Sequence, residues 1–251
     1  MSTTTLELSI LGPALVAGLL VLATHVPLGM EVLRRGIIFI DLAIAQMAGL
    51  GALAGLVFWP DAAEGSGPLV VQGCSLVAAL GGALLLTWTE RRFPEEQEAL
   101  IGCLFVLSAS LALLLIGQNP GGGEHLKDLL AGQILWVGWS QIGVVAAVYA
   151  ILLVAWFGFR DRFGRSGFYV VFAVAVTASV QLVGVYLVFA CLIMPALAAR
   201  KTRRGVPLIA GYFIGAVGLA AGLTLSALFD LSTGPAVVTT MAVSALVAAR
   251  L

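Results

Sequence analysis

The fold of this chain is decided by one continuous apolar stretch, GFYVVFAVAVTASVQLVGVYLVFACLIMPALAA, residues 167–199. Membrane strands alternate apolar with polar residues, and this stretch does not, so we interpret it as helical. One helix needs about 20 apolar residues to cross the bilayer core, and two need about 40. The 33 residues available therefore predict a pair of short helices, or one span with a re-entrant piece. The expected bend is at 181–184, where Gln181 and Gly184 interrupt the run. One long tilted helix is the alternative.

The composition of the whole chain agrees with this stretch. Of 251 residues, 61% are apolar and 10% are charged, whereas a soluble domain has about 45–50% and about 25%. Too few charges remain to solvate a surface, and the 13 basic and 13 acidic residues cancel. These values exclude a soluble globule, a disordered chain and a nucleic-acid binder, and they indicate a protein surrounded by membrane lipid.

Further apolar runs of similar length lie on both sides of the deciding stretch. They cover residues 9–30, 36–58, 68–89, 98–117, 134–159, 206–228 and 234–250. Charged or Pro/Gly-rich segments separate them. We expect an all-α, polytopic helical membrane protein of about eight or nine transmembrane helices, including the short broken pair. Residues 1–251 are expected to form a single transmembrane domain.

The cations predict the orientation of the chain. All but Lys127 follow the first, third, fifth and sixth apolar runs or end the chain, and placing them in the cytoplasm satisfies the positive-inside rule. They are Arg34, Arg35, Arg91, Arg92, Arg160, Arg162, Arg165, Arg200, Lys201, Arg203, Arg204 and Arg250. The amino terminus is then outside and the carboxyl terminus inside. Because cations flank 167–199 at both ends, that stretch must return to its starting side. Broken helices in membranes line polar paths or pack in protein, which is a first indication of transport.

Asp41 is the clearest candidate for a functional group inside the membrane. It lies about five residues into its apolar run, and ionisable groups at such depth usually mark a pathway. We interpret it as a carboxylate on a cation path, and an ion pair with Arg34 or Arg35 is the alternative. Three neutral residues could add oxygen donors to such a path, namely Gln46, Gln133 and Gln181. On a regular helix, Ala45 shares the Asp41 face and Gln46 does not.

An outward loop follows the glycines at 121–123. Glu124, His125 and Asp128 provide oxygen and imidazole ligand types at helical spacing, so metal could enter here from outside. Ordinary solvated charges are the alternative. His25, deep in the first run, is more typical of a hydrogen-bonded packing residue than of a ligand.

Other residues have simpler interpretations. The isolated cysteines predict neither a disulfide framework nor a structural zinc site. They are Cys74, Cys103 and Cys191. The glycine pairs 211/215 and 218/222 predict close helix packing. No nucleophile motif, phosphate-binding loop or dinucleotide fingerprint is present, so we expect no enzyme activity and ATP hydrolysis only in a separate subunit.

Four segments together resemble the membrane permeases of zinc/manganese ABC importers. They are RRGIIFIDLAIAQMAGLG (34–51), EALIGCLF (98–105), VGVYLVFACLIMPALAAR (183–200) and GLTLSALFDLSTGP (222–235). The resemblance implies one permease domain in the bacterial cytoplasmic (inner) membrane that forms a homodimer. It implies cytoplasmic ATPase subunits and an extracytoplasmic metal-binding protein as partners. A divalent metal cation would be the substrate, moved by alternating access, with no permanently bound cofactor.

The chain departs from this family pattern at three places. The family's histidine four residues after Asp41 falls on Ala45, and the sequence AGQ (131–133) stands where the family often has an acidic group. The cytoplasmic stretch before Val183 is reduced to 160–167. Its charged residues are candidates for ATPase coupling or ordinary positive-inside anchors, namely Arg160, Asp161, Arg162 and Arg165. A docking element elsewhere, for example near Glu90–Glu98, is the alternative. Two alternatives follow, an importer of a metal chelate or other small solute, and an uncoupled, gradient-driven carrier.

Overall fold

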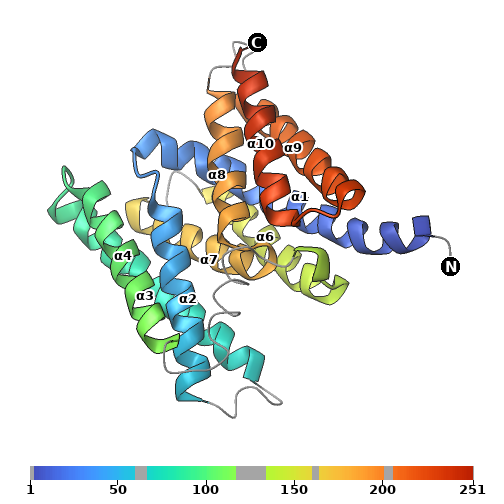
Figure 1. The fold of residues 1–251 in the computed structure, drawn as a ribbon. Helices are drawn as coiled ribbons and strands as arrows, with labels where there is room; N and C mark the ends of the chain where they lie inside the picture. The colour runs from blue at the N-terminus through green and yellow to red at the C-terminus, as the bar shows by residue number, and fades with distance from the viewer. Residues whose placement is uncertain (1–2, 60–66, 117–133, 160–163, 201–205, 251) are drawn as a thin grey trace. The chain divides into compact units, whose positions relative to one another are not determined.

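The computed structural model describes residues 3–59, 67–116, 134–159, 164–200 and 206–250 (Figure 1). These residues form nine α-helices and one 3₁₀ helix, and no strand occurs among them, which confirms the all-α prediction. The elements are α1 (Thr3–Arg35), α2 (Ile40–Phe58), α3 (Gly67–Arg92), α4 (Gln97–Ile116), η2 (Ile134–Trp136), α6 (Trp139–Phe159), α7 (Gly164–Val183), α8 (Val185–Ala199), α9 (Pro207–Phe229) and α10 (Thr233–Arg250).

The helices have the lengths that a bilayer requires. Seven of the described helices, α1 to α4, α6, α7 and α9, are long and apolar enough to cross a membrane. Two shorter apolar helices, Val185–Ala199 and Thr233–Ala249, accompany them. The chain is thus a polytopic helical membrane protein. Together the two groups match the expected helix number.

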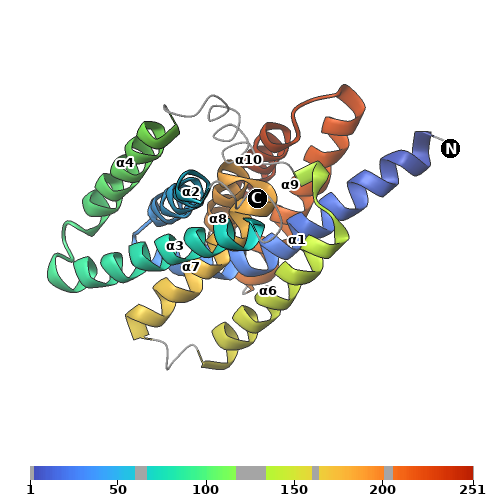
Figure 2. The same cartoon turned by 90° about the horizontal axis from the view of Figure 1, so that it is seen from below.

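The chain forms two compact units, each described here by itself. The terminal unit contains Met1–Arg35, Leu130–Leu153 and Ser179–Leu251, and the central unit contains Gly36–Leu129 and Val154–Ala178. In the central unit, α2 packs against both α3 and α4 (Figure 2). In the terminal unit, α1, α8, α9 and α10 pack on one another (Figure 1).

Helix α7 ends and α8 begins at a break centred on Gly184, where the sequence predicts a bend. The predicted pair of short helices is only half right, because α7 is long enough to cross a membrane and α8 alone is short. Gly184 has φ +79° and ψ 161°, a region of backbone space that is essentially restricted to glycine. Its amide donates to the Val180 carbonyl at 2.9 Å, and the Val188 amide donates to the Gly184 carbonyl at 3.1 Å. The backbone is therefore redirected while these hydrogen bonds are retained, as apolar surroundings require.

Replacing Gly184 with alanine is expected to destabilise the protein by about 1–3 kcal/mol, because the new Cβ makes this conformation strained. Gly143→Ala in α6 is the matched control, since a Cβ there meets nothing within 4 Å. Thermal unfolding in detergent measures the difference. Equal melting temperatures for the two variants would contradict a break that depends on glycine.

The glycine pairs of α9 allow the close helix contacts expected of them. A Cβ at Gly215 would lie 2.6 Å from Leu22 Cδ2 of α1. A Cβ at Gly222 would lie 2.4 Å from the Val237 Cα of α10. Both separations are far below van der Waals contact. The Leu22 side chain could shift, but the Val237 Cα is backbone, so α9 approaches α10 this closely only because Gly222 has no side chain.

A proline in α1 receives a compensating hydrogen bond from α9. Pro27 has no N–H, so the carbonyl of Ala23, four residues earlier, lacks its helical donor. The Tyr212 hydroxyl donates to this carbonyl at 2.9 Å. A part-buried backbone oxygen is thus satisfied by a residue that lies 189 positions further along the chain.

Tyr212→Phe is expected to lower the free energy of unfolding by about 1–2 kcal/mol, because the Ala23 carbonyl loses its donor. In a Pro27→Ala background the restored amide at residue 27 can donate instead. We therefore expect the same substitution to have a smaller effect there. Equal losses in both backgrounds, measured by thermal or denaturant unfolding, would show that Tyr212 acts through packing alone.

Candidate functional site

The candidate site is built around Asp41, in the first turn of α2. Its side chain is fully buried, at 0% exposure. Neither carboxylate oxygen has a hydrogen-bond partner among the described residues. Burial of an unpartnered carboxylate is unfavourable by several kcal/mol, so a chain keeps one where its chemistry is used. An unpartnered carboxyl group inside a membrane span is a candidate cation ligand, since its ionised form attracts a cation.

The two arginines at the end of α1 have another partner. Arg35 Nε donates to Glu31 Oε1 at 2.8 Å, Arg34 Nε donates to Glu31 Oε2 at 2.9 Å, and a terminal nitrogen of Arg34 also contacts Glu31. Glu31 is buried, with its side chain 3% exposed. The alternative ion pair of Asp41 is not observed in the described ranges.

The face of α2 that carries Asp41 has no second polar donor one turn further on. Ala45 occupies that position and is 1% exposed. Gln46 is half-buried and lies about 140° round the helix from Asp41. Gln181 is exposed, three residues before the break at Gly184. Whether these glutamines join Asp41 on one path stays a prediction.

Several predicted residues fall outside the described part of the chain. They are Gln133, Glu124, His125, Asp128, Arg160, Asp161 and Arg162. Arg165 is in the first turn of α7, and its side chain is not among those described. Among the described residues no group of three or more His, Cys, Asp and Glu could hold a metal ion. None of the three cysteines forms a disulfide.

His25 of the terminal unit is a hydrogen-bonded packing residue, as predicted. Its Nδ1 lies 3.0 Å from the Val21 carbonyl, which can only accept, so Nδ1 carries the proton. Its Nε2 then accepts from the Ser179 hydroxyl at 3.0 Å. Both ring nitrogens are occupied, which leaves no lone pair for a metal. Ser179 thereby ties the end of α7 to α1, a contact that the apolar pattern did not indicate.

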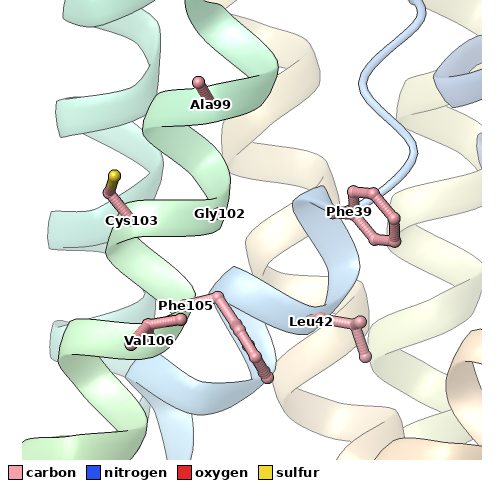
Figure 3. A pocket seen from close by; sticks show the side chains of 7 residues that line it. All are labelled: Phe39, Leu42, Ala99, Gly102, Cys103, Phe105 and Val106. Atoms are coloured by element: carbon pink, nitrogen blue, oxygen red, sulfur yellow. The ribbon is translucent and has the colours of Figure 1, made fainter.

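An apolar pocket of about 660 Å³ lies between α2 and α4 (Figure 3). Two of its side chains come from the start of α2 and the others from α4. The lining residues are Phe39, Leu42, Ala99, Gly102, Cys103, Phe105 and Val106. Cys103 is the one side chain among them with an atom that commonly binds a metal, and a single thiol does not make a cation site. The pocket is therefore separate in chemistry from the Asp41 site.

Sequence reasoning missed one residue near this site. The Phe39 amide, at the start of α2, donates to Glu98 Oε1 at 3.3 Å. The sequence signal was present, because Phe39 stands where helices usually have Ser, Thr, Asp or Asn. A helix without a local cap requires a donor or acceptor from elsewhere, but the pattern does not say which residue supplies it.

A family model matches nearly the whole chain. The model described as "ABC 3 transport family" covers residues 7–164 and 157–251. The chain is 24% identical to the high-affinity zinc uptake system membrane protein ZnuB of Haemophilus influenzae, over 91% of this chain and 92% of that protein. It is 28% identical to the manganese transport system membrane protein MntC of Bacillus subtilis, over 87% of this chain and 56% of that protein.

A solved structure has the same fold. PsaBC from Streptococcus pneumoniae in complex with Fab superposes with a TM-score of 0.73. The match covers 95% of this chain and 90% of that one at 22% sequence identity. The arrangement of helices is thus one already seen in an experimental structure. A sequence identity of 22% supports the shared fold and no other shared property.

Proposed function

We propose that this chain, which belongs to the ABC 3 transport family, is the membrane-spanning permease subunit of an ATP-driven importer for a divalent metal cation of the zinc or manganese class. The observation that carries the proposal is Asp41, a carboxylate buried in a membrane span with both oxygens unpartnered. The named functions of the zinc and manganese relatives support the substrate class.

The metal is the substrate, and no resident cofactor is needed. Asp41 attracts the cation into the membrane, where a negative charge offsets part of the lost hydration. Gln46, Gln133 and Gln181 provide neutral oxygen donors along the path. On the outer side, Glu124, His125 and Asp128 receive the cation from an extracytoplasmic metal-binding protein. The path opens to one side at a time as the ATPase subunits open and close.

ATP hydrolysis belongs to separate cytoplasmic subunits, since the 251-residue sequence has no phosphate-binding loop. We propose a homodimer of this chain in the bacterial cytoplasmic membrane, with the amino terminus outside and the carboxyl terminus inside. The cation distribution supports this orientation. The short segment with Arg160, Asp161, Arg162 and Arg165 contacts the ATPase.

A metal chelate is the second candidate substrate. Ala45 is buried one turn beyond Asp41 and has no donor atom. A cation that arrives with its own ligands needs fewer from the protein, so this position favours a chelate over a bare ion. Competition between free and chelated metal for uptake separates the two substrates.

The experiment that tests the coupled importer is a detergent pull-down of the tagged chain from its native membrane. A stoichiometric ATPase subunit among the co-purifying proteins is the expected result. Recovery of the chain without an ATPase, under conditions that keep a control importer intact, would contradict the proposal. The uncoupled carrier would then be the better interpretation.

A further inference from the structure

We propose that Glu98 is a positioning residue, which caps α2 from α4 and thereby holds the helix turn that carries Asp41. The inference rests on the proposed function for its transport consequences, whereas the capping itself does not. Glu98 would act through the α2 backbone and would not bind the cation. Three observations in the central unit support this role.

The first observation is that α2 begins without a local side-chain cap, and its first amide, that of Ile40, donates to the Ile37 carbonyl at 3.2 Å. A helix N-terminus leaves four N–H groups without helical partners, and an oxygen-bearing side chain at the N-cap usually accepts from one of them. The N-cap here is Phe39, with no side-chain capping hydrogen bond. The residues before it are glycine and isoleucine, at 36–38. Asp41 has no partner in the described residues, so it does not cap the helix either.

The second observation is that the Glu98 carboxylate, distant in sequence, accepts a hydrogen bond at the start of α2. Glu98 Oε1 accepts from the Phe39 amide at 3.3 Å, across 59 positions of sequence. Glu98 is also in the first turn of α4. The N-termini of α2 and α4 therefore meet at a single carboxylate. Both helix dipoles are positive at this end, so a negative charge is favoured there more than a neutral side chain.

The third observation is that hydrogen bonds hold the residue before Glu98 in place. The preceding residue, Gln97, is 4% exposed, and its Nε2 donates to the Leu86 carbonyl at 3.1 Å and to the Tyr169 hydroxyl at 3.2 Å. A hydrogen bond of 2.9 Å from Arg91 to Ser166 joins the end of α3 to the start of α7. The turn before α4 is thus tied to α3 and α7, and Glu98 extends this link to α2.

The geometry of α2 indicates that Glu98 would not contact a cation bound at Asp41. Phe39 and Leu42 line the pocket that α2 shares with α4 (Figure 3). At about 100° per residue, Asp41 lies about 100° from Leu42 and about 200° from Phe39. The Asp41 side chain therefore leaves α2 away from the α4 side. Glu98 reaches the amide at the helix end and can influence Asp41 only by fixing the turn between them.

The transport test compares Glu98→Ala, Glu98→Gln and Glu96→Ala in the complete importer, with zinc and manganese uptake by cells as the readout. Loss of the cap is expected to raise the KM for metal about 10-fold. Glu98→Gln retains a carbonyl oxygen for the Phe39 amide and is expected to recover most of the affinity. Glu96→Ala is the matched control, because Glu96 is an exposed carboxylate two residues away.

A purely structural Glu98 would give a different pattern. The amount of folded protein and the maximal rate would fall together, with an unchanged KM per folded transporter, and this result would overturn the proposal. A double-variant cycle adds a second criterion. If Glu98 acts through Asp41, then Glu98→Ala should reduce metal affinity in the wild-type background and have little further effect beside Asp41→Asn.

The cap can also be tested without any transport. Hydrogen exchange of the detergent-purified full chain should be about 10-fold faster at the first α2 amides in Glu98→Ala, and unchanged in Glu96→Ala. Unchanged exchange in both variants would overturn the capping role. Wild-type cells could take up neither metal while hydrogen exchange in Glu98→Ala is faster as expected. This result would contradict the proposed function and support the capping role of Glu98. The two failures are therefore distinguishable.

Discussion

Replacing Asp41 with asparagine is expected to lower zinc or manganese uptake by about 100-fold or more, while the protein stays at least as stable as the wild type. Loss of one buried charged partner typically weakens binding by about 2–5 kcal/mol, and each 1.4 kcal/mol is about tenfold. The buried carboxylate has no partner in the described structure, so its removal abolishes no native hydrogen bond there. Uptake by cells and thermal unfolding in detergent are the two measurements.

Glu31→Gln is the matched control for this prediction. Glu31 is also a buried carboxylate in a membrane span, but Arg34 and Arg35 both pair with it. Its neutralisation is expected to lower the melting temperature, because two guanidinium groups lose their charged partner. The two variants thus separate a carboxylate kept for stability from one kept for function. Normal uptake by Asp41→Asn would remove this carboxylate from the mechanism.

Gly29→Ala is expected to have the largest effect on folding. A Cβ at Gly29 would lie 1.9 Å from the Leu192 carbonyl oxygen of α8 and 3.2 Å from the Ala196 Cβ. A backbone oxygen cannot rotate away, so α1 and α8 would have to separate along their contact. Overpacking commonly destabilises by about 1–3 kcal/mol, and a clash with backbone belongs at or above the upper end of that range.

Gly12→Ala provides the comparison within the same helix, because a Cβ there meets nothing within 4 Å. We expect Gly12→Ala to behave as the wild type, and Gly29→Ala to give little monodisperse protein in size-exclusion chromatography. A Gly29→Ala protein with a wild-type elution profile and melting temperature would show that the α1–α8 approach is not needed for folding.

The apolar runs predicted the helices closely. The run 98–117 corresponds to α4 at Gln97–Ile116, and the run 234–250 corresponds to α10 at Thr233–Arg250. The break at Gly184 was also predicted, from a stretch too long for one span and too short for two. These features could be predicted from the sequence because a helix makes its backbone hydrogen bonds within itself. Its extent in a membrane therefore depends on local composition and length.

The neighbours of each polar group were accessible only in the tertiary structure. The sequence predicts that Asp41 lies in a membrane span. Only the tertiary structure shows that its carboxylate has no partner in the described residues, and that Arg34 and Arg35 both pair with Glu31. Nothing in the sequence around Pro27 indicates that the Tyr212 hydroxyl donates to the Ala23 carbonyl.

The same is true of the cap on α2, which Glu98 supplies from α4. Helix formation is decided by residues within a few positions of each other. Hydrogen bonds between helices depend on which side chains packing brings within about 3 Å, and no local pattern contains that information. Local composition therefore specified the spans, their break and the candidate carboxylate, whereas tertiary packing set which polar groups are hydrogen-bonded and which, Asp41 among them, are not.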